Sequence, residues 1–518
     1  MFVHDTIRMS GNKFGHRPAV VTEQRTVTFG ELQDSCWRLA NALGAVAQPG
    51  DRVAVLAENL PEYVECYYGV PAAGLALTFL NYRLHPREWA WIINDAEARV
   101  VFVQGRYAEA LHDHLDETPS VEHVVVIDDG TPISGSLTTY DDLLAAASAV
   151  EPDVVRDDAE IAWLLYTSGT TGFPKGAMLS HRNVTTGMLN MGLSLEAIPD
   201  ERSLIAFPLC HIAGFTVPLT HLRGGRVVLP PAFDPEGWMR MVDEHRITST
   251  SMAPTMLNMI LQDPAIDSYD LGSMRNLGYG AAAMPVEVLK SAIDRFGPVV
   301  VSGFGMTELA GNVLTFSKAA HARAVAGEAH LLASCGVPQP LAEVKVVDEA
   351  FVECPHGEVG EIVVRGEQTL SGYFGNEQAT HDAYVDGWFR TGDLARRDEE
   401  GFFYVVDRRK DMINTGGENV YSREVEEALY AHPAVSEVAV VGIPDPTWGE
   451  NVTAVVVLRP GAAATEQEIV DVVRDRLAGY KTPKRVHFVD ELPKTVTGKI
   501  VKREVRERLV EAGGRSDS

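Results

Sequence analysis

Apolar runs of strand length alternate with longer apolar or amphipathic stretches through the first two thirds of the chain. The runs at 51–57, 98–103 and 161–166 predict buried strands. The apolar stretch 60–76 has the length of a helix, and another stretch with helical spacing begins at Asp234, a residue type that caps helices. Strands that alternate with helices predict mostly parallel sheets covered by helices.

The pattern changes after about residue 340, where short alternating strands separated by turns predict a small β subdomain. The charged segment 407–426 contains two glycines and is interpreted as a linker. Strands are expected again at 435–445 and 452–458, followed by a helix that begins with the capping box of Thr465 and Glu468. The roughly 110 residues after Asp407 are enough for an independent small α+β domain.

Composition limits the possible functions. A chain of 518 residues is too long for one ordinary core, so two or more domains are expected. The net charge of −27 argues against nonspecific binding of nucleic acid and against docking on anionic membranes. Five cysteines without C-x-x-C spacing predict neither a metal cluster nor a disulfide framework, and favour a reducing compartment. Neither a signal peptide nor a transmembrane segment is recognised, so a cytoplasmic location is expected.

Glycine-rich loops follow the predicted strands near residues 166, 278 and 302, and ligands of parallel sheets bind beyond such strand ends. The first loop, YTSGTTGFPKG, combines glycines, hydroxyl side chains and Lys175. Backbone N–H groups, hydroxyls and a lysine together can hold phosphate. The spacing matches neither the Walker pattern nor the dinucleotide fingerprint. The loop is therefore either a phosphate loop of another kind or an ordinary linker, and the apolar run before it favours the first.

Five motifs occur in order along the chain: the loop at 166–176, GFGMTE at 303–308, RTGD at 390–393, DRRKDMINTGGENV at 407–420 and PKTVTGKIVKR at 493–503. Together they resemble an acyl-CoA synthetase of the acyl-adenylate-forming superfamily, which includes fatty acyl-CoA synthetases, coumarate-CoA ligases, peptide-synthetase adenylation domains and beetle luciferases. The resemblance covers nearly the whole chain. It implies an α/β fold with three parts: a large domain of mostly parallel sheets and a small β subdomain over 1–407, a hinge at 408–410 and a mobile α+β domain over 411–518.

The resemblance implies an ATP site. The phosphates and pyrophosphate would be held by the loop, through Thr167, Ser168, Gly169, Thr170, Thr171, Gly172 and Lys175. The adenine would contact Ala281, Ala282, Ala283, Phe304, Gly305 and Met306, although the family often has proline near Ala283 and usually tyrosine at 304. Asp393 would accept hydrogen bonds from both ribose hydroxyls, with Arg408 beside it. Without the family context, Asp393 could equally be a turn or capping residue.

The catalytic residues implied by the resemblance are Thr307 at the α-phosphate, Glu308 as the Mg²⁺ ligand and Lys499, which would bridge the acid and ATP. The resemblance also implies a catalytic role for His211, as the gate of the acyl pocket near the entry of carboxylate and thiol. In isolation Glu308 would be read as a solvated loop acid and Lys499 as a surface lysine. Lys410 would be the pivot of the hinge, and the family usually has glycine where this chain has Asp407.

The acyl pocket implied by the resemblance comprises His211, Ile212, Ala213, Gly280 and Gly303. Because coumarate ligases carry an aromatic residue near Ala213, the alanine favours an open, aliphatic pocket. Gly416 and Gly417 would line the pantetheine tunnel, unless they form only a turn; His211 could likewise be a packed histidine.

The expected activity is therefore ATP- and Mg²⁺-dependent synthesis of acyl-CoA from a hydrophobic acid, with a medium- or long-chain fatty acid favoured. An aryl-acid ligase, a steroid side-chain ligase and an enzyme that loads a carrier protein are alternatives within the family. A nucleotide-binding protein without catalysis is the alternative from another class. The partners expected are the acid, ATP and CoA, with no nucleic acid, and a homodimer is the expected oligomer.

Overall fold

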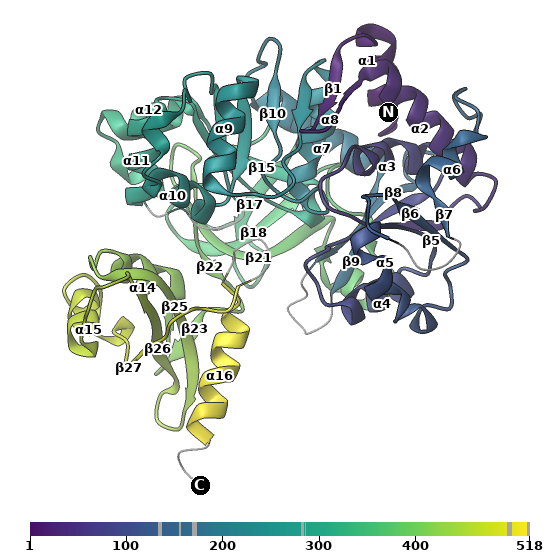
Figure 1. Ribbon diagram of the computed structural model, residues 1–518. Coiled ribbons are helices and arrows are strands. Elements are labelled where there is room, and N and C mark those ends of the chain that lie inside the picture. Colours follow the sequence, from purple (N-terminus) through teal and green to yellow (C-terminus); the bar gives the residue numbers. More distant parts are fainter. Residues whose placement is uncertain are drawn as a thin grey trace.

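The computed structural model describes residues 1–132, 137–154, 157–167, 174–280, 284, 286–494 and 500–514. Two large sheets, a smaller antiparallel sheet and a separate small domain make up the fold (Figure 1). This confirms the predicted α/β class, with mostly parallel sheets covered by helices in the large N-terminal part. Among the described residues, no helix is both long and apolar enough to cross a membrane.

Among the described residues, the first sheet contains eight strands, and its central strands pair in parallel. Their order is β19 (Gly372–Tyr373), β9 (Lys175–Ser180), β8 (Ile161–Thr167), β4 (Ala76–Leu80), β3 (Arg52–Leu56), β5 (Ala98–Gln104), β6 (His123–Ile127) and β7 (Thr138–Thr139). Alternate residues of these strands point to opposite faces. One face packs against helices α2 (Phe29–Leu43) and α3 (Pro61–Ala72), and the other against α4 (Pro86–Asp95) and α5 (Gly105–His112).

In the part of the chain that the structure describes, the second sheet contains nine strands, and most of its pairs are again parallel. Their order is β16 (Val337–Pro338), β15 (Gly311–Phe316), β14 (Val300–Met306), β13 (Asn276–Tyr279), β12 (Ser249–Met252), β10 (Arg202–Leu204), β11 (Arg226–Val228), β1 (Pro18–Val21) and β2 (Thr26–Thr28). One face is covered by α9 (Pro235–His245), α10 (Pro254–Gln262), α11 (Val286–Phe296) and α12 (Lys318–Ala326). Helix α9 is capped by Asp234, as the sequence predicts, because its carboxylate accepts a hydrogen bond from the backbone of Gly237 at 2.7 Å.

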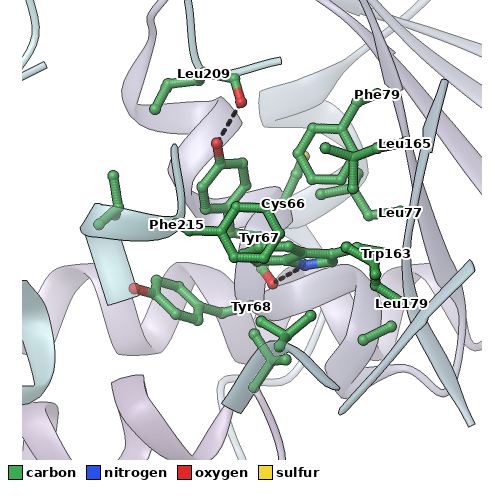
Figure 2. Close-up of a cluster of buried hydrophobic side chains, with 14 of the residues drawn as sticks. Cys66, Tyr67, Tyr68, Leu77, Phe79, Trp163, Leu165, Leu179, Leu209 and Phe215 are labelled. Carbon is green, nitrogen blue, oxygen red and sulfur yellow. Dashed lines mark hydrogen bonds between the residues drawn. The ribbon is translucent and has the colours of Figure 1, made fainter. Parts of the chain in front are cut away.

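The main core lies between the two large sheets. Within it, Trp163 of β8 packs edge to face against Phe79 of β4 and Phe215, and Tyr67 of α3 packs at a tilt against Phe79 and Trp163 (Figure 2). All four side chains are at least 95% buried. Helices α7 (His181–Ser194) and α8 (Thr216–Leu222) contribute to the same cluster. Burying several aromatic side chains here stabilises the packing of this core.

The small β subdomain is an antiparallel sheet of β17 (Glu343–Val347), β18 (Val359–Arg365), β21 (Trp388–Arg397), β20 (Tyr384–Val385) and β22 (Phe403–Arg408). The small domain has its own sheet of β24 (Glu418–Val420), β23 (Ile413–Thr415), β26 (Gly449–Leu458), β25 (Val435–Asp445) and β27 (Arg485–Phe488). Its helices are α14 (Ser422–Tyr430), α15 (Glu466–Arg474) and α16 (Lys502–Gly514). The interpretation of 407–426 as a linker is wrong, because this segment contains two paired strands and the start of α14.

Candidate functional site

The predicted phosphate loop connects two strands that pair with each other. Thr167 ends β8 and Lys175 begins β9, and these two residues face each other in the antiparallel register. The hydroxyl of Thr167 donates to the carbonyl oxygen of Lys175 at 3.4 Å. The loop is therefore closed at its base, with Lys175 fixed at its exit. The predicted phosphate contacts Ser168, Gly169, Thr170, Thr171 and Gly172 lie outside the described residues.

Glu308 is buried, with 7% of its surface exposed. It lies in a single turn of 3₁₀ helix, Thr307–Leu309, directly after β14. The hydroxyl of Tyr373 donates to its Oε1 at 3.1 Å, and the backbone N–H of Leu370 donates to its carbonyl at 2.7 Å. Burial raises the pKa of Glu308, whereas the Tyr373 hydrogen bond and the charge of Arg408 lower it. The structure therefore holds this carboxylate away from bulk water and in a fixed direction.

Tyr373 connects Glu308 to the base of the phosphate loop. It lies in the short strand β19, which pairs with β9 so that Tyr373 faces Ala177. The ammonium of Lys175 lies 5.3 Å from the centre of the Tyr373 ring, within the range of a cation–π interaction. The two ends of the Tyr373 side chain thus contact two predicted ATP-site residues that are far apart in sequence. The sequence analysis did not identify Tyr373, because strand pairing rather than spacing brings it to the site.

Asp393 and Arg408 form the second charged pair. They face each other across the antiparallel pair of β21 and β22, and Nε of Arg408 lies 3.1 Å from Oδ1 of Asp393. Asp393 is 4% exposed. Both groups act electrostatically on Glu308, Arg408 by lowering its pKa and Asp393 by raising it. The structure therefore brings the GFGMTE and RTGD motifs together.

The ends of β13 and β14 lie beside each other, since Tyr279 faces Ser302. A side chain at Gly303 would meet the carbonyl of Leu314 at 2.5 Å, and one at Gly305 would meet that of Gly311 at 2.1 Å. These two glycines are required by the close approach of β14 and β15. Among the described residues, the nearest atom to a Cβ at Gly280 would be the carbonyl oxygen of Gly303, at 4.0 Å.

Phe304 and Met306 are half-buried and pack against the main core cluster. The remaining predicted adenine contacts, Ala281, Ala282 and Ala283, lie outside the described residues.

His211 lies in the segment that follows β10, at the carboxyl-end edge of the first sheet. Its Nε2 lies 3.4 Å from Nδ2 of Asn81, one residue beyond the end of β4. Burial, with a contribution from the charge of Arg83, lowers the pKa of His211 to about 4, so the ring is neutral near pH 7. Of the neighbouring Ile212 and Ala213, only the backbone is described, within the turn Ile212–Phe215.

Hydrogen bonds from side chains of the core hold the 205–214 segment in place. The hydroxyl of Tyr67 donates to the carbonyl of Leu209 (Figure 2), and Oδ1 of Asn59 accepts from the N–H of Leu209 at 2.8 Å. A Cβ at Gly214 would lie 1.9 Å from the Tyr67 hydroxyl oxygen. Glycine is therefore needed at 214 for the chain to approach Tyr67.

Lys410 is exposed in a turn after β22, where the N–H groups of Asp411 and Met412 both donate to the carbonyl of Arg408. Asp407 precedes this turn and is buried. Its Oδ2 accepts hydrogen bonds from the N–H of Ser422 at 2.5 Å and from the Ser422 hydroxyl at 2.8 Å. Asp407 belongs to the last strand of the subdomain, whereas Ser422 begins α14 of the small domain. These two hydrogen bonds therefore cross the connection between the domains.

Gly416 and Gly417 form the two-residue turn of the β23–β24 hairpin, with φ values of 62° and 85°. Two consecutive positive φ angles are typical of this turn and favour glycine at both positions. A Cβ at Gly416 would also meet the ring of Trp448 at 2.9 Å. The turn alone thus accounts for both glycines. Lys499 lies outside the described residues, which resume at Ile500.

The arrangement of described side chains is suited to a nucleotide. Lys175 and Arg408 supply positive charge, Glu308 supplies an oxygen ligand for a cation, and Asp393 supplies two acceptor oxygens. All four lie on elements of the large N-terminal part.

Comparison with known proteins identifies the family. Residues 7–374 match the AMP-binding enzyme family, and residues 424–499 match the AMP-binding enzyme C-terminal domain. A feruloyl-CoA synthase of Amycolatopsis sp. is 40% identical over 501 residues, which are 95% of this chain and 96% of that protein. A medium/long-chain-fatty-acid–CoA ligase of Mycobacterium tuberculosis, FadD8, is 36% identical over 522 residues, which are 97% of this chain and 89% of that one.

The structure of an anthranilate CoA ligase, AuaEII, in complex with anthranoyl-AMP superposes with a TM-score of 0.91 at 26% identity, covering 99% of this chain and 98% of that one. The chain belongs to the AMP-binding enzyme family. Within it, the chain is an acyl-CoA synthetase of the acyl-adenylate-forming superfamily, an acid–thiol ligase whose small-molecule substrates are an acid, ATP and CoA.

Proposed function

We propose that this synthetase activates a hydrophobic carboxylic acid in a Mg²⁺-dependent, two-step reaction. The acid carboxylate attacks the α-phosphate of ATP, the bond to pyrophosphate breaks, and an acyl-adenylate forms. The CoA thiol then loses its proton and attacks the acyl carbon, which gives the thioester and releases AMP. The observation that carries the proposal is the cluster of Lys175, Glu308, Asp393 and Arg408. Tyr373 joins Lys175 to Glu308, and the paired charges of Arg408 and Asp393 act on Glu308.

The phosphate end of the site is served by Thr167 and Lys175 together with the loop residues Ser168 to Gly172. Lys175 offsets the negative charge of the β- and γ-phosphates and of the departing pyrophosphate. The hydroxyls and the glycine N–H groups of the loop donate to phosphate oxygens. Thr307 acts beside the α-phosphate.

Glu308 fits a Mg²⁺ ligand. It presents carboxylate oxygens, the ligand type that Mg²⁺ prefers, and its burial protects the contact from water. Mg²⁺ takes few protein ligands and completes its shell with phosphate oxygens and water, so one carboxylate is sufficient. When bound, Mg²⁺ neutralises phosphate charge. Asp393 accepts the two ribose hydroxyls with Arg408 beside it, and the segments 281–283 and 304–306 flank the adenine.

The acyl group enters beside His211, Ile212, Ala213, Gly280 and Gly303. Because His211 is neutral near pH 7, it can lie beside an apolar group and still hydrogen-bond to a carboxylate. The space that the described residues leave beside Gly280 and the small side chain of Ala213 support an unbranched apolar tail, and hence a medium- or long-chain fatty acid. An aryl acid is the second candidate, which the similarity to a feruloyl-CoA synthase favours.

The two steps use different arrangements of the small domain. Lys499 bridges acid and ATP in the first step, and rotation about Lys410 then replaces it by the Gly416–Gly417 turn, which lines the path of the thiol. Lys499→Ala should therefore abolish adenylation yet spare thioester formation from synthetic acyl-AMP. Equal loss of both half-reactions in a folded variant would reject this division of labour.

The substrate class is tested by measuring kcat/KM for acetate, octanoate, palmitate and ferulate, with AMP formation as the readout. The fatty-acid proposal expects kcat/KM to rise by a few-fold per methylene and then level, since each buried methylene contributes about 0.8 kcal/mol. A clear preference for ferulate would show that the substrates are aryl acids and not fatty acids. Release of pyrophosphate without formation of an acyl-CoA would instead support a carrier-loading enzyme. No release of pyrophosphate with any acid would support a nucleotide-binding protein without catalysis.

A further inference from the structure

Tyr373 is the described side chain that joins the base of the phosphate loop to the carboxylate of Glu308. Its ring faces the Lys175 ammonium at 5.3 Å, and its hydroxyl donates to Glu308 Oε1 at 3.1 Å. Tyr373 is half-buried, and the pairing of its strand with β9 places it opposite Ala177. Two different parts of one rigid side chain therefore serve two different groups.

The surroundings fix Tyr373 from both sides. The N–H of Tyr373 donates to the hydroxyl of Thr380 at 2.9 Å, and that hydroxyl donates to the carbonyl of Asn376 at 3.0 Å. The next residue, Phe374, donates its N–H to the carbonyl of Gly176 at 2.8 Å. The strand that carries Tyr373 is thus tied directly to the residue that follows Lys175, so the backbone of Tyr373 is fixed relative to the loop base.

The Glu308 turn is fastened by the same segment. The side-chain amide of Gln368, which is fully buried, donates to the carbonyls of Leu309 and Asn312 at 2.8 and 3.1 Å. The N–H of Leu370 donates to the carbonyl of Glu308 at 2.7 Å. These contacts hold the backbone of the turn, and only the Tyr373 hydroxyl among the contacts described for this segment reaches the carboxylate itself.

We infer that Tyr373 is a positioning residue that couples the two halves of the phosphate site: its hydroxyl aims the Glu308 carboxylate at the cation that accompanies ATP, and its ring holds the Lys175 ammonium toward the phosphates. The inference rests on the proposed role of Glu308 as the Mg²⁺ ligand. The hydroxyl and the ring serve separate groups, so their contributions are separable by substitution. Tyr373→Phe removes the first alone, and Tyr373→Leu removes both.

The test is the dissociation constant of ATP, measured by titration calorimetry on the full-length protein without acid, once in EDTA and once in saturating Mg²⁺. Tyr373→Phe should leave the affinity in EDTA unchanged and reduce the gain in affinity that Mg²⁺ provides by about tenfold or more, the usual effect of losing a hydrogen bond to a metal-ligating group. Tyr373→Leu should in addition weaken binding in EDTA by a few-fold, through loss of the cation–π contact.

Two further variants separate the possible failures. Glu308→Gln should abolish the Mg²⁺ gain, and adding Tyr373→Phe to it should cost nothing more, because the hydroxyl acts through the carboxylate. If Glu308→Gln keeps the full gain, the proposed metal role of Glu308 is wrong. If Glu308→Gln loses the gain while Tyr373→Phe keeps it, the metal role stands and the positioning role is rejected.

Tyr384→Phe is the matched control. Its hydroxyl donates at 2.6 Å to the carbonyl of Leu370, in the same segment but away from the carboxylate. This variant should keep the wild-type response to Mg²⁺. If it weakens the Mg²⁺ gain as much as Tyr373→Phe does, the segment acts only as a structural support and the inference is overturned.

Discussion

Gly214→Ala is a substitution whose effect can be worked out from the structure. The added Cβ would lie 1.9 Å from the Tyr67 hydroxyl oxygen and 3.0 Å from the carbonyl oxygen of Leu209. Real contacts of this kind lie at 3.0 Å or more, so the segment or the ring must move by about 1 Å. Tyr67 is 1% exposed and packs against Phe79 and Trp163 (Figure 2), so we expect the segment that carries His211 to move rather than the ring.

Overpacking of this kind costs about 1–3 kcal/mol of stability, and displacement of the Leu209 carbonyl weakens a buried hydrogen bond worth about 1 kcal/mol. We therefore expect the free energy of unfolding to fall by about 2–4 kcal/mol. A displacement near 1 Å at the acid-binding edge should lower kcat/KM for the acid by up to about a hundredfold. The KM for ATP should change little, since Gly214 contacts none of the described phosphate-site residues.

The assay is steady-state AMP formation with the acid or ATP varied, together with urea unfolding. Tyr67→Phe supplies the rescue: without the hydroxyl, the nearest atoms to the new Cβ lie at 3.0 Å, so the double variant should recover part of kcat/KM. Gly479→Ala is the control glycine, since a Cβ there meets no atom of the described residues within 4 Å, and it should behave as wild type. A Gly214→Ala enzyme with unchanged kinetics and stability, or a double variant worse than the sum of the two single changes, would refute the reasoning.

Three further outcomes are expected. Burial raises the pKa of Glu65, which accepts a hydrogen bond from Tyr140 at 2.8 Å, to about 8. The folded protein therefore keeps a proton that the unfolded chain releases above about pH 4.5, and stability falls as pH rises toward 8. Glu65→Gln should abolish that decline, which is on the order of 4 kcal/mol in urea unfolding, and a persisting decline would assign it to other groups. Lys410→Pro should trap the hinge, since proline fixes φ. Rapid-quench analysis should then show acyl-AMP accumulating. Acyl transfer to CoA at the wild-type rate would show that Lys410 is not the hinge residue. Asp393→Asn should raise the dissociation constant of ATP about tenfold or more in calorimetry, and ATP binding at wild-type strength would exclude Asp393 from the ribose contact.

Much of the fold was predictable because local pattern and tertiary structure agree. The runs at 98–103 and 161–166 form β5 and β8, and the capping box of Thr465 and Glu468 begins α15. The segment 407–426 was misread as a linker because its charges and glycines resemble a loop. In the folded chain those glycines make the tight turn of a hairpin, which composition alone does not reveal.

The site was less accessible to sequence reasoning. Asp393 and Arg408 were named only through the resemblance of their motifs, and their contact depends on the register of β21 with β22. Tyr373 lies 65 residues from Glu308, and Tyr67 lies 142 residues from Leu209. The periodicity of the sequence does not predict contacts between residues so far apart along the chain. These contacts depend on which strands pair and which helix covers them.

The hydrogen bonds between Asp407 and Ser422 have a consequence for how the two domains respond to temperature. Among the described residues, the hydrophobic clusters of the small domain contain only residues from 413 onward, and those of the large part end before 406. A change in their relative position therefore breaks hydrogen bonds to a carboxylate that water can replace, at about 1.5–3 kcal/mol each, and opens neither core. Heat capacity changes mainly with the exposure of apolar surface. An equilibrium between positions of the small domain should thus carry almost no heat-capacity change, and its temperature dependence should follow a straight van't Hoff line over the range in which the protein remains folded.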